Sequence, residues 1–462
     1  PFPALLAWAV YYSRSDYARA AELFAEAAKS YGDKTNEHLY YEAKSLSRNQ
    51  RDDEALVKYR ALSRLGGTFA EHALFQVARL TFLGGDWPAA VKAYEVYAAS
   101  YKKGRQHEAE LNAELPLARL AAGQFERAER ELGALVDRQK EPLERARLVE
   151  LWGAAAEGAG KREVALMRYR AVIDDRPLSL PALLAQSRII ALGEPPPPVI
   201  LPGTDAVPGA PLSLELPDKT RRLDRVGLDD LAEASLQAEE GRLRAGFGAR
   251  ADEGLCELYG QLASARRRYQ IAQTATSWSA LRVAPTARTR WQSSCIYPAP
   301  YSPLVRDATK KFQLAPAFVY GVMRQESAFR PTVVASANAV ALRQIMPPTA
   351  SRIAAELDVG FEPSRLAAPA TNVEFGAFYL RKLLDTFAGR LELAAAAYNA
   401  GPSAVSRWLQ SGEKLPLDLF LARIPYEETR NYVVRVIGNT ARYAYLEGGE
   451  SAIPPIELAL PL

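Results

Sequence analysis

The chain has 462 residues, enough for several domains at the usual size of about 150 residues each. Its hydrophobic content of 48% can supply globular cores. Its net charge of +4 does not indicate a nucleic-acid partner, since such partners usually bind a concentrated basic patch. No apolar run reaches the roughly 18 residues of a membrane span. The sequence starts at Pro1 without a basic leader, so we expect any signal peptide to have been removed or never included.

A repeated pattern fills the first 190 residues. A small or polar turn precedes each helix start, and an alanine follows at a fixed place. These alanines are 35, 35, 38 and 37 residues apart: Ala20, Ala55, Ala90, Ala128 and Ala165. A period near 34 with two helices resembles tetratricopeptide repeats. The pattern predicts a tetratricopeptide-like superhelix, which serves either as a binding scaffold with a concave face or as an architectural spacer.

The rest of the chain also reads as helical, after a break. Four prolines follow Glu194, and further Pro and Gly residues continue to Pro211, so this stretch cannot form a helix. Helical patterns resume near Leu223. No convincing set of alternating strands appears, apart from a short hairpin expected beside the active-site loop. The fold class predicted is therefore all-α.

The cysteines and histidines carry little information. Cys256 and Cys295 lie 39 residues apart, and the sequence leaves open whether they form a disulfide or remain two buried thiols. His38, His72 and His107 share no metal-ligand spacing and read as ordinary helix residues. No metal-binding motif is present, and no cofactor is expected.

Glu326 is the strongest candidate for chemistry. The apolar pattern from Val305 to Phe329 predicts a helix with a start at Pro316, which places Glu326 near a carboxyl end among apolar neighbours. Desolvation and the helix dipole would both raise the pKa of such a carboxyl, which suits a proton donor to a glycosidic oxygen. The alternative is an ordinary glutamate paired with Arg324 or Arg330.

Glu326 belongs to the first of four sequence motifs that follow one another along the chain. Together, residues 297–445 resemble the soluble lytic transglycosylase family, relatives of goose-type lysozyme, and the repeats resemble the superhelix of its soluble members. The motifs are Val319-Tyr-Gly-Val-Met-Arg-Gln-Glu-Ser-Ala-Phe329, Gln344-Ile-Met-Pro347 with Thr349-Ala350, Ala396-Ala-Tyr-Asn-Ala-Gly-Pro402, and Ile424-Pro-Tyr-Glu-Glu-Thr-Arg430 with Tyr432-Val433.

The resemblance implies a periplasmic lyase that acts on peptidoglycan glycan strands. Glu326 would be the lone acid and base, cleaving the bond between N-acetylmuramic acid and N-acetylglucosamine to leave a 1,6-anhydro product. Most glycosidases use two carboxylates. Cell-wall proteins are expected as partners of the superhelix. The residues implied to bind substrate are Gln344, Met346, Tyr398, Asn399 and Glu428, with Arg430 in the same motif as Glu428.

Simpler roles remain open for four of these positions. Met346 would alternatively belong to the core, and Gln344 would only bond the loop backbone. Tyr398 and Asn399 would only end a helix before Gly401.

The expected organisation has five segments. Residues 1–192 form the superhelical repeat domain, 193–220 a Pro-rich connection and 221–296 a helical linker domain. Residues 297–450 form the lysozyme-like catalytic domain, and 451–462 a carboxyl-terminal tail.

One loop departs from the family pattern, which reads Ser-x-x-Gly-Ala-x-Gly-Leu-Met-Gln. Ala335, Asn338, Ala341 and Arg343 stand at its Ser, first Gly, second Gly and Met. Loss of a positioned hydroxyl costs about tenfold to a thousandfold at other transition states. Two alternatives therefore stay open: a catalytically weakened member that binds glycan or organises other enzymes, and a hydrolase of the lysozyme type.

Overall fold

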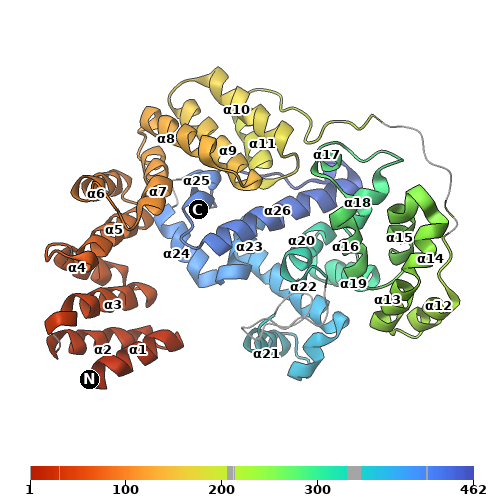
Figure 1. The fold of residues 1–462 in the computed structure, drawn as a ribbon, viewed down its shortest axis with the longest axis horizontal. Helices are drawn as coiled ribbons and strands as arrows, with labels where there is room; N and C mark the ends of the chain where they lie inside the picture. Colours follow the sequence, from red (N-terminus) through yellow and green to blue (C-terminus); the bar gives the residue numbers. More distant parts are fainter. Residues whose placement is uncertain are drawn as a thin grey trace. The chain divides into compact units, whose positions relative to one another are not determined.

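The computed structural model describes residues 2–30, 32–204, 212, 214–329, 345–412 and 415–461. Throughout this part, helices are joined by turns and loops (Figure 1), and an isolated bridge pairs Leu201 with Val283. The all-α prediction is confirmed. The loop near which a hairpin is expected, with Ala335 and Arg343, lies outside the described residues. None of the described helices is both long enough and apolar enough to span a membrane.

Two compact units make up the chain. Unit 1 contains residues 1–140, 151–165 and 408–425, and unit 2 contains residues 141–150, 166–407 and 426–462. Helices α9 (Pro142–Gly158), α10 (Arg162–Asp175) and α24 (Pro402–Gly412) have residues in both. The Pro-rich stretch lies between α11, which ends at Ala191, and α12, which begins at Asp218. The division into five segments remains a prediction.

Unit 1 is a row of helices in which each contacts the next along the chain, as Figure 1 shows for α1 to α8. Its helices are α1 (Phe2–Ser13), α2 (Tyr17–Ser30), α3 (Thr35–Arg48), α4 (Asp52–Leu62), α5 (Thr68–Leu83), α6 (Trp87–Ser100), α7 (Glu108–Ala121), α8 (Phe125–Arg138) and α25 (Leu417–Arg423).

The repeat alanines lie where these helices touch. All five have 0% exposure: Ala20, Ala55, Ala90, Ala128 and Ala165. Five or six residues before each, the turn contains a residue of positive φ: Arg14, Gln50, Gly85, Gly123 and Gly160. Glycine adopts this left-handed conformation at little cost, which explains its use in three of the turns. The small alanine lets neighbouring helices approach, and the turn reverses the chain.

Arg423 ties α25 to the repeats within unit 1. Its guanidinium donates to the carbonyl oxygens of Leu83 at 2.8 Å and Trp408 at 2.6 Å, and to Ser411 Oγ at 2.9 Å. The residue is 3% exposed, and burial lowers its pKa to about 10. This arginine therefore caps the carboxyl end of α5 from a segment more than 300 residues away.

A histidine pair joins α5 to the start of α7. His72 Nδ1 lies 2.7 Å from His107 Nε2, and His107 stacks on Phe75 with ring centroids 4.2 Å apart. Beside them, Glu71 Oε1 accepts from Tyr97 Oη at 3.0 Å and from the backbone N–H of Gln106 at 2.7 Å. The sequence did not predict this pair. Its members are 35 residues apart, one repeat period, so the repeat places them side by side.

We expect this pair to make the stability of unit 1 depend on pH. Burial, and next the charge of His107, lower the pKa of His72; Lys44 also lowers it, and Glu71 opposes them. Glu110 lies 3.5 Å from His107 Nδ1. A depressed pKa means that the unfolded chain binds the proton more readily. The stabilisation is therefore complete above the unfolded value of about 6.5 and is lost as pH falls below it.

Thermal unfolding between pH 7.5 and 5 measures this effect. The free energy of unfolding should fall with decreasing pH, by at most about 1.4 kcal/mol per pH unit for each extra proton taken up by the unfolded chain. The variant His72→Gln should show a shallower slope. His38, whose pKa burial also lowers, keeps that slope above zero. An unchanged slope in His72→Gln would contradict the prediction.

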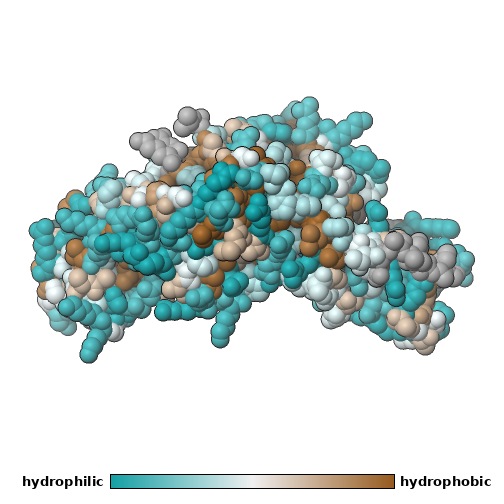
Figure 2. Space-filling model, turned by 90° about the horizontal axis from the view of Figure 1, so that it is seen from above, coloured by the Kyte–Doolittle hydropathy of each residue, from teal (hydrophilic) through white to brown (hydrophobic). Residues whose placement is uncertain are grey.

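Unit 2 holds the candidate site. Its helices are α11 (Leu180–Ala191), α12 (Asp218–Arg225), α13 (Asp229–Ala238), α14 (Glu240–Phe247), α15 (Ala251–Tyr259), α16 (Arg266–Ala275), α17 (Trp278–Leu281), α18 (Arg290–Ile296), α19 (Ser302–Phe312), α20 (Pro316–Ser327), α21 (Pro347–Glu356), α22 (Pro369–Thr386), α23 (Leu391–Ala400) and α26 (Glu427–Gly448). Helix α26 packs against both α20 and α23, and α22 packs against α19, α21 and α23. In Figure 2 the visible face of the molecule is mostly hydrophilic, with hydrophobic residues between.

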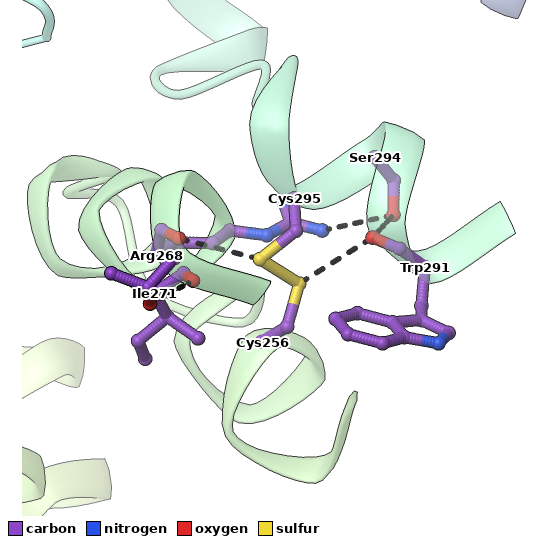
Figure 3. The surroundings of a disulfide bond; sticks show 7 residues. Cys256, Arg268, Ile271, Trp291, Ser294 and Cys295 are labelled. Carbon is purple, nitrogen blue, oxygen red and sulfur yellow. Dashed lines mark hydrogen bonds between the residues drawn. A yellow bond between two sulfur atoms is a disulfide. The ribbon is translucent and has the colours of Figure 1, made fainter. Parts of the chain in front are cut away.

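A disulfide crosslinks α15 to α18. Cys256 and Cys295 are bonded, with their Cα atoms 5.8 Å apart, and both are fully buried (Figure 3). Around them pack Ala272 and Ile296, with Trp291 partly buried at the edge. The sequence left open whether these cysteines form a disulfide or remain two buried thiols, and the structure shows the disulfide. Disulfides persist in oxidising compartments.

Helices α20 and α26 cross closely at Gly321. A Cβ added to Gly321 would lie 2.4 Å from Thr440 Oγ1 and 3.0 Å from the Val436 carbonyl oxygen. The missing side chain is therefore what allows this approach. Because Glu326 follows on the same helix, the crossing also sets its distance from α26.

We expect Gly321→Ala to destabilise unit 2. The added methyl group overpacks a buried helix crossing, which typically costs about 1–3 kcal/mol. The matched control is Gly241→Ala on α14, where an added Cβ meets nothing within 4 Å. That change should be neutral or stabilising by up to about 1 kcal/mol, as alanine favours helix.

Denaturant unfolding of both variants tests the crossing. Adding Thr440→Ala to Gly321→Ala should restore part of the loss, because the oxygen nearest the new methyl is then gone. If the destabilisation of the double variant equals the sum of those caused by Gly321→Ala and Thr440→Ala alone, the two residues are not in contact as described.

Candidate active site

Glu326 lies in the last turn of α20, as the sequence predicts. The helix has Pro316 in its first turn and buries Phe318, Val319, Val322 and Met323. It ends at a left-handed Ala328 with φ of 47°, whose N–H donates to the Arg324 carbonyl oxygen at 3.2 Å. The Glu326 side chain is half-buried. The helix end therefore holds a carboxyl group at the edge of the core.

Tyr432 on α26 holds this carboxyl group. Its hydroxyl donates to Glu326 Oε1 at 2.5 Å, and the tyrosine is only 6% exposed. A hydrogen bond this short fixes the orientation of the carboxyl group. Tyr432 was recognised as part of a motif, but its contact with Glu326 was not predicted. The 106 residues between them give no local signal for it.

Arg324 binds other groups, although the sequence offered it as an ordinary partner of Glu326. Its Nε donates to Asn439 Oδ1 at 3.1 Å, and its Nη1 donates to the Ile296 carbonyl oxygen. The guanidinium carbon lies 4.7 Å from the ring centroid of Tyr269 and 4.3 Å from that of Tyr297. Arg324 therefore anchors α20 to α26 and to the residues after α18.

Tyr398 and Asn399 lie in the last turn of α23. Asn399 Oδ1 accepts from the Thr429 hydroxyl at 2.6 Å, and Thr429 is on α26 three residues before Tyr432. The Tyr398 ring lies 5.6 Å from that of Tyr379. Both predicted residues are half-buried. Helix α26 therefore contacts the Glu326 motif and the Tyr398–Asn399 motif through positions on its first two turns.

Of the remaining predicted residues, two are exposed and one lies outside the described residues. Met346 precedes α21 and is 40% exposed, so it does not belong to the core. Glu428 is exposed in the first turn of α26. Gln344 lies outside the described residues, as does Arg330. The same holds for the divergent loop positions Ala335, Asn338, Ala341 and Arg343.

The next acidic residues after Glu326 are Glu356, Asp358 and Glu362, and none of them lies in a matching motif. Glu356, at the end of α21, is held by Lys382 Nζ at 2.5 Å. A carboxylate fixed by a lysine on a neighbouring helix has a structural role already. The arrangement therefore centres on one glutamate with a tyrosine donor.

Comparisons with known proteins agree with this fold. The 70-kDa soluble lytic transglycosylase of Escherichia coli matches with a TM-score of 0.62 and 20% identity, over 96% of this chain and 68% of that one. A lytic transglycosylase of Pseudomonas aeruginosa, solved as an inactive glutamate-to-glutamine mutant, matches with a TM-score of 0.58 and 19% identity, over 98% and 67%. The fold is that of an all-helical superhelix joined to a lysozyme-like domain.

Sequence comparison identifies a known domain in this chain. Residues 303–419 match the model of the transglycosylase SLT domain. The soluble lytic murein transglycosylase of Escherichia coli strain K12 is 33% identical over 160 residues, which are 34% of this chain and 25% of the relative. The aligned part thus spans about a quarter of the length of that curated relative. The chain carries a transglycosylase SLT domain, and the resemblance predicted from the motifs is confirmed over residues 303–419, which contain three of the four motifs.

Proposed function

We propose that this protein is a peptidoglycan lyase, a lytic transglycosylase with Glu326 as its single acid and base. The observation that carries the proposal is the carboxyl group of Glu326, which lies among the residues that match the transglycosylase SLT domain and accepts a hydrogen bond from Tyr432 at 2.5 Å. The substrate is the β-1,4 bond between N-acetylmuramic acid and N-acetylglucosamine. The bacterial periplasm, where this polymer lies, is the proposed compartment, and the buried disulfide fits an oxidising one.

The proposed reaction uses one carboxyl group twice. Glu326 donates its proton to the glycosidic oxygen as the bond from that oxygen to the muramoyl C1 breaks. The carbonyl oxygen of the substrate's acetamide stabilises the positive charge that develops at C1. Glu326 then takes the proton from the muramoyl 6-hydroxyl while that oxygen bonds to C1. The products are a free N-acetylglucosamine end and a 1,6-anhydromuramoyl end, and no water is consumed.

The substrate-binding residues in this proposal are Gln344, Met346, Tyr398, Asn399 and Glu428. Two features support part of this set. The 40% exposure of Met346 leaves its thioether available, and the Asn399–Thr429 bond fixes the end of α23 against α26. Exposed Glu428 suits a contact with sugar hydroxyls.

Product analysis tests the proposal directly. Purified peptidoglycan is digested with the intact chain, and the muropeptides are analysed by mass spectrometry. We expect anhydromuropeptides, each lighter by one water than its hydrolytic counterpart. Products that have gained water would instead identify a hydrolase. Retention of the protein on peptidoglycan without any product would identify a glycan-binding or scaffold member.

A further inference from the structure

A cavity of about 430 Å³ lies at the opposite end of α20 from Glu326. This volume is within the usual range for small-ligand pockets. Its walls come from α18, α19, the first turns of α20 and the last turns of α26, all in unit 2. We name it the tyrosine pocket, after three of its lining residues: Tyr297, Tyr320 and Tyr443.

The tyrosine pocket is separate from the candidate active site. Tyr320 precedes Glu326 by six residues on α20, which is about 9 Å along the helix axis. Six residues make about one and two-thirds turns, so the two side chains point to different sides of the helix. On α26, Tyr443 lies eleven residues beyond Tyr432. A ligand of this pocket would therefore be an effector and would not compete with glycan at the acid.

The floor of the tyrosine pocket is aromatic and apolar. Tyr320 and Tyr443 are each 6% exposed, and their rings stack with centroids 5.3 Å apart. Their hydroxyl groups already donate to backbone carbonyl oxygens, that of Pro300 at 3.2 Å and that of Pro298 at 2.8 Å. Val305 on α19 is 1% exposed and adds aliphatic surface. The floor therefore offers carbon surface, and aromatic rings pack well against other rings.

Charged side chains surround the mouth of the tyrosine pocket. Arg290, Arg306 and Glu447 line it and are exposed. Burial is the largest cause of the raised pKa of Tyr320; Glu447 raises this pKa further and Arg306 lowers it, so both charges lie near that ring. Within the described part of the chain, neither arginine forms an ion pair. Two cations against one carboxylate leave an excess of positive charge, which attracts an anionic group.

We propose that the tyrosine pocket binds an aromatic carboxylate. The ring of the ligand would pack against Tyr320 and Tyr443 on the floor. Its carboxylate would form two parallel hydrogen bonds with the guanidinium group of Arg306 at the mouth. The ligand chemistry thus follows from an apolar aromatic floor below a cationic mouth.

Tyr297 connects the tyrosine pocket to the candidate acid. Its ring lies 5.5 Å from the ring of Tyr443 and 4.3 Å from the guanidinium carbon of Arg324. Because Arg324 anchors the last turns of α20, a ligand that packs beside Tyr297 would influence the position of Glu326. This effector role rests on the proposed function, whereas binding of the ligand does not.

Ligand-observed NMR titrations of the intact chain test the binding without any glycan. The probes are phenylpropionate, the uncharged phenylpropanol, and octanoate, which has the carboxylate but an acyl chain in place of the ring. Probes of this size should bind in the millimolar range. We expect phenylpropionate to bind at least about tenfold more tightly than phenylpropanol, because charge-assisted hydrogen bonds are strong. It should also bind more tightly than octanoate, because the floor is aromatic.

Variants at exposed positions locate the bound probe. Arg306→Gln should reduce the affinity for phenylpropionate to about that for phenylpropanol, and Arg306→Lys should keep part of the difference. Ala299→Trp fills the mouth from an exposed position and should abolish binding of all three probes. Lys310→Gln, which removes a positive charge from α19 outside the pocket, is the matched control and should change nothing.

The effector role is measured on the Glu326→Gln protein with a peptidoglycan oligosaccharide, which this variant should not cleave. Saturating phenylpropionate should change the affinity for the oligosaccharide by about fivefold or more in either direction, the lower end of usual coupling between two sites. Adding Ala299→Trp should remove that change. An unchanged affinity would overturn the effector role.

Three results would overturn the binding site itself. The first is equal affinity for phenylpropionate and phenylpropanol with no effect of Arg306→Gln. The second is tighter binding of octanoate, which would show a site for acyl chains. The third is the absence of saturable binding of phenylpropionate. Each of them would leave the product analysis of peptidoglycan unaffected, so it is distinguishable from failure of the proposed function.

Discussion

Replacing Glu326 by glutamine should lower the rate of anhydromuropeptide release by about 10²–10⁴-fold, the usual contribution of a general acid and base. Glutamine has the same shape but holds no transferable proton. Its amide oxygen can still accept the Tyr432 hydroxyl, so the hydrogen bond on α26 is retained. We therefore expect the melting temperature of the variant to equal that of the wild type. Turnover on purified peptidoglycan and thermal unfolding, measured on the same preparations, check both parts.

The matched control for this loss is Glu374→Gln on α22. Glu374 pairs with Lys311 at 2.7 Å on the surface of the same unit. Surface ion pairs are worth little, so the control should keep full turnover. Wild-type rates in Glu326→Gln would assign the acid to another group. No products from either the wild type or the variant would instead favour the scaffold alternative.

Removing the disulfide should have the largest effect on stability. The variant Cys256→Ala with Cys295→Ala lacks a crosslink between residues 39 apart, and loss of such a native bond typically costs about 2–4 kcal/mol. The effect should extend to α20, since Ile296 and Tyr297 follow Cys295 directly and contact Arg324. A lower melting temperature and a lower rate of glycan cleavage are both expected.

Reductant provides the control for the disulfide. Dithiothreitol should lower the melting temperature of the wild type and leave that of the double alanine variant unchanged. Equal melting temperatures of the oxidised wild type and the variant would show that the bond adds nothing to stability. A reductant effect of the same size in both proteins would show that reductant acts elsewhere.

Periodic features of the fold could be predicted from the sequence because every repeat packs its helices in the same way. A small residue recurs at each helix contact, and Ala20 to Ala165 are all fully buried. Pro316 likewise marks the start of α20 correctly. The apolar pattern that begins at Val305 covers two helices, α19 and α20, and Gln313 takes a left-handed conformation between them. No apolar pattern reports such a backbone angle.

Contacts between distant segments could not be predicted in the same way. The pairing of Cys256 with Cys295 depends on how α15 and α18 pack, and the count of residues between them does not fix that. Glu326 could be identified from its motif, whereas its contact with Tyr432 required the helix crossing at Gly321.

The two histidines of the pair are one repeat apart, and this spacing limits how the repeat region of unit 1 can change its length. His72 meets His107, and Glu71 meets Gln106, each across 35 residues. Helices in such arrays contact only their neighbours, so stability accumulates one module at a time. Duplicating or deleting a complete module would preserve the remaining contacts, whereas removing a single residue would shift the register of those that follow. The array can therefore be lengthened or shortened in whole modules.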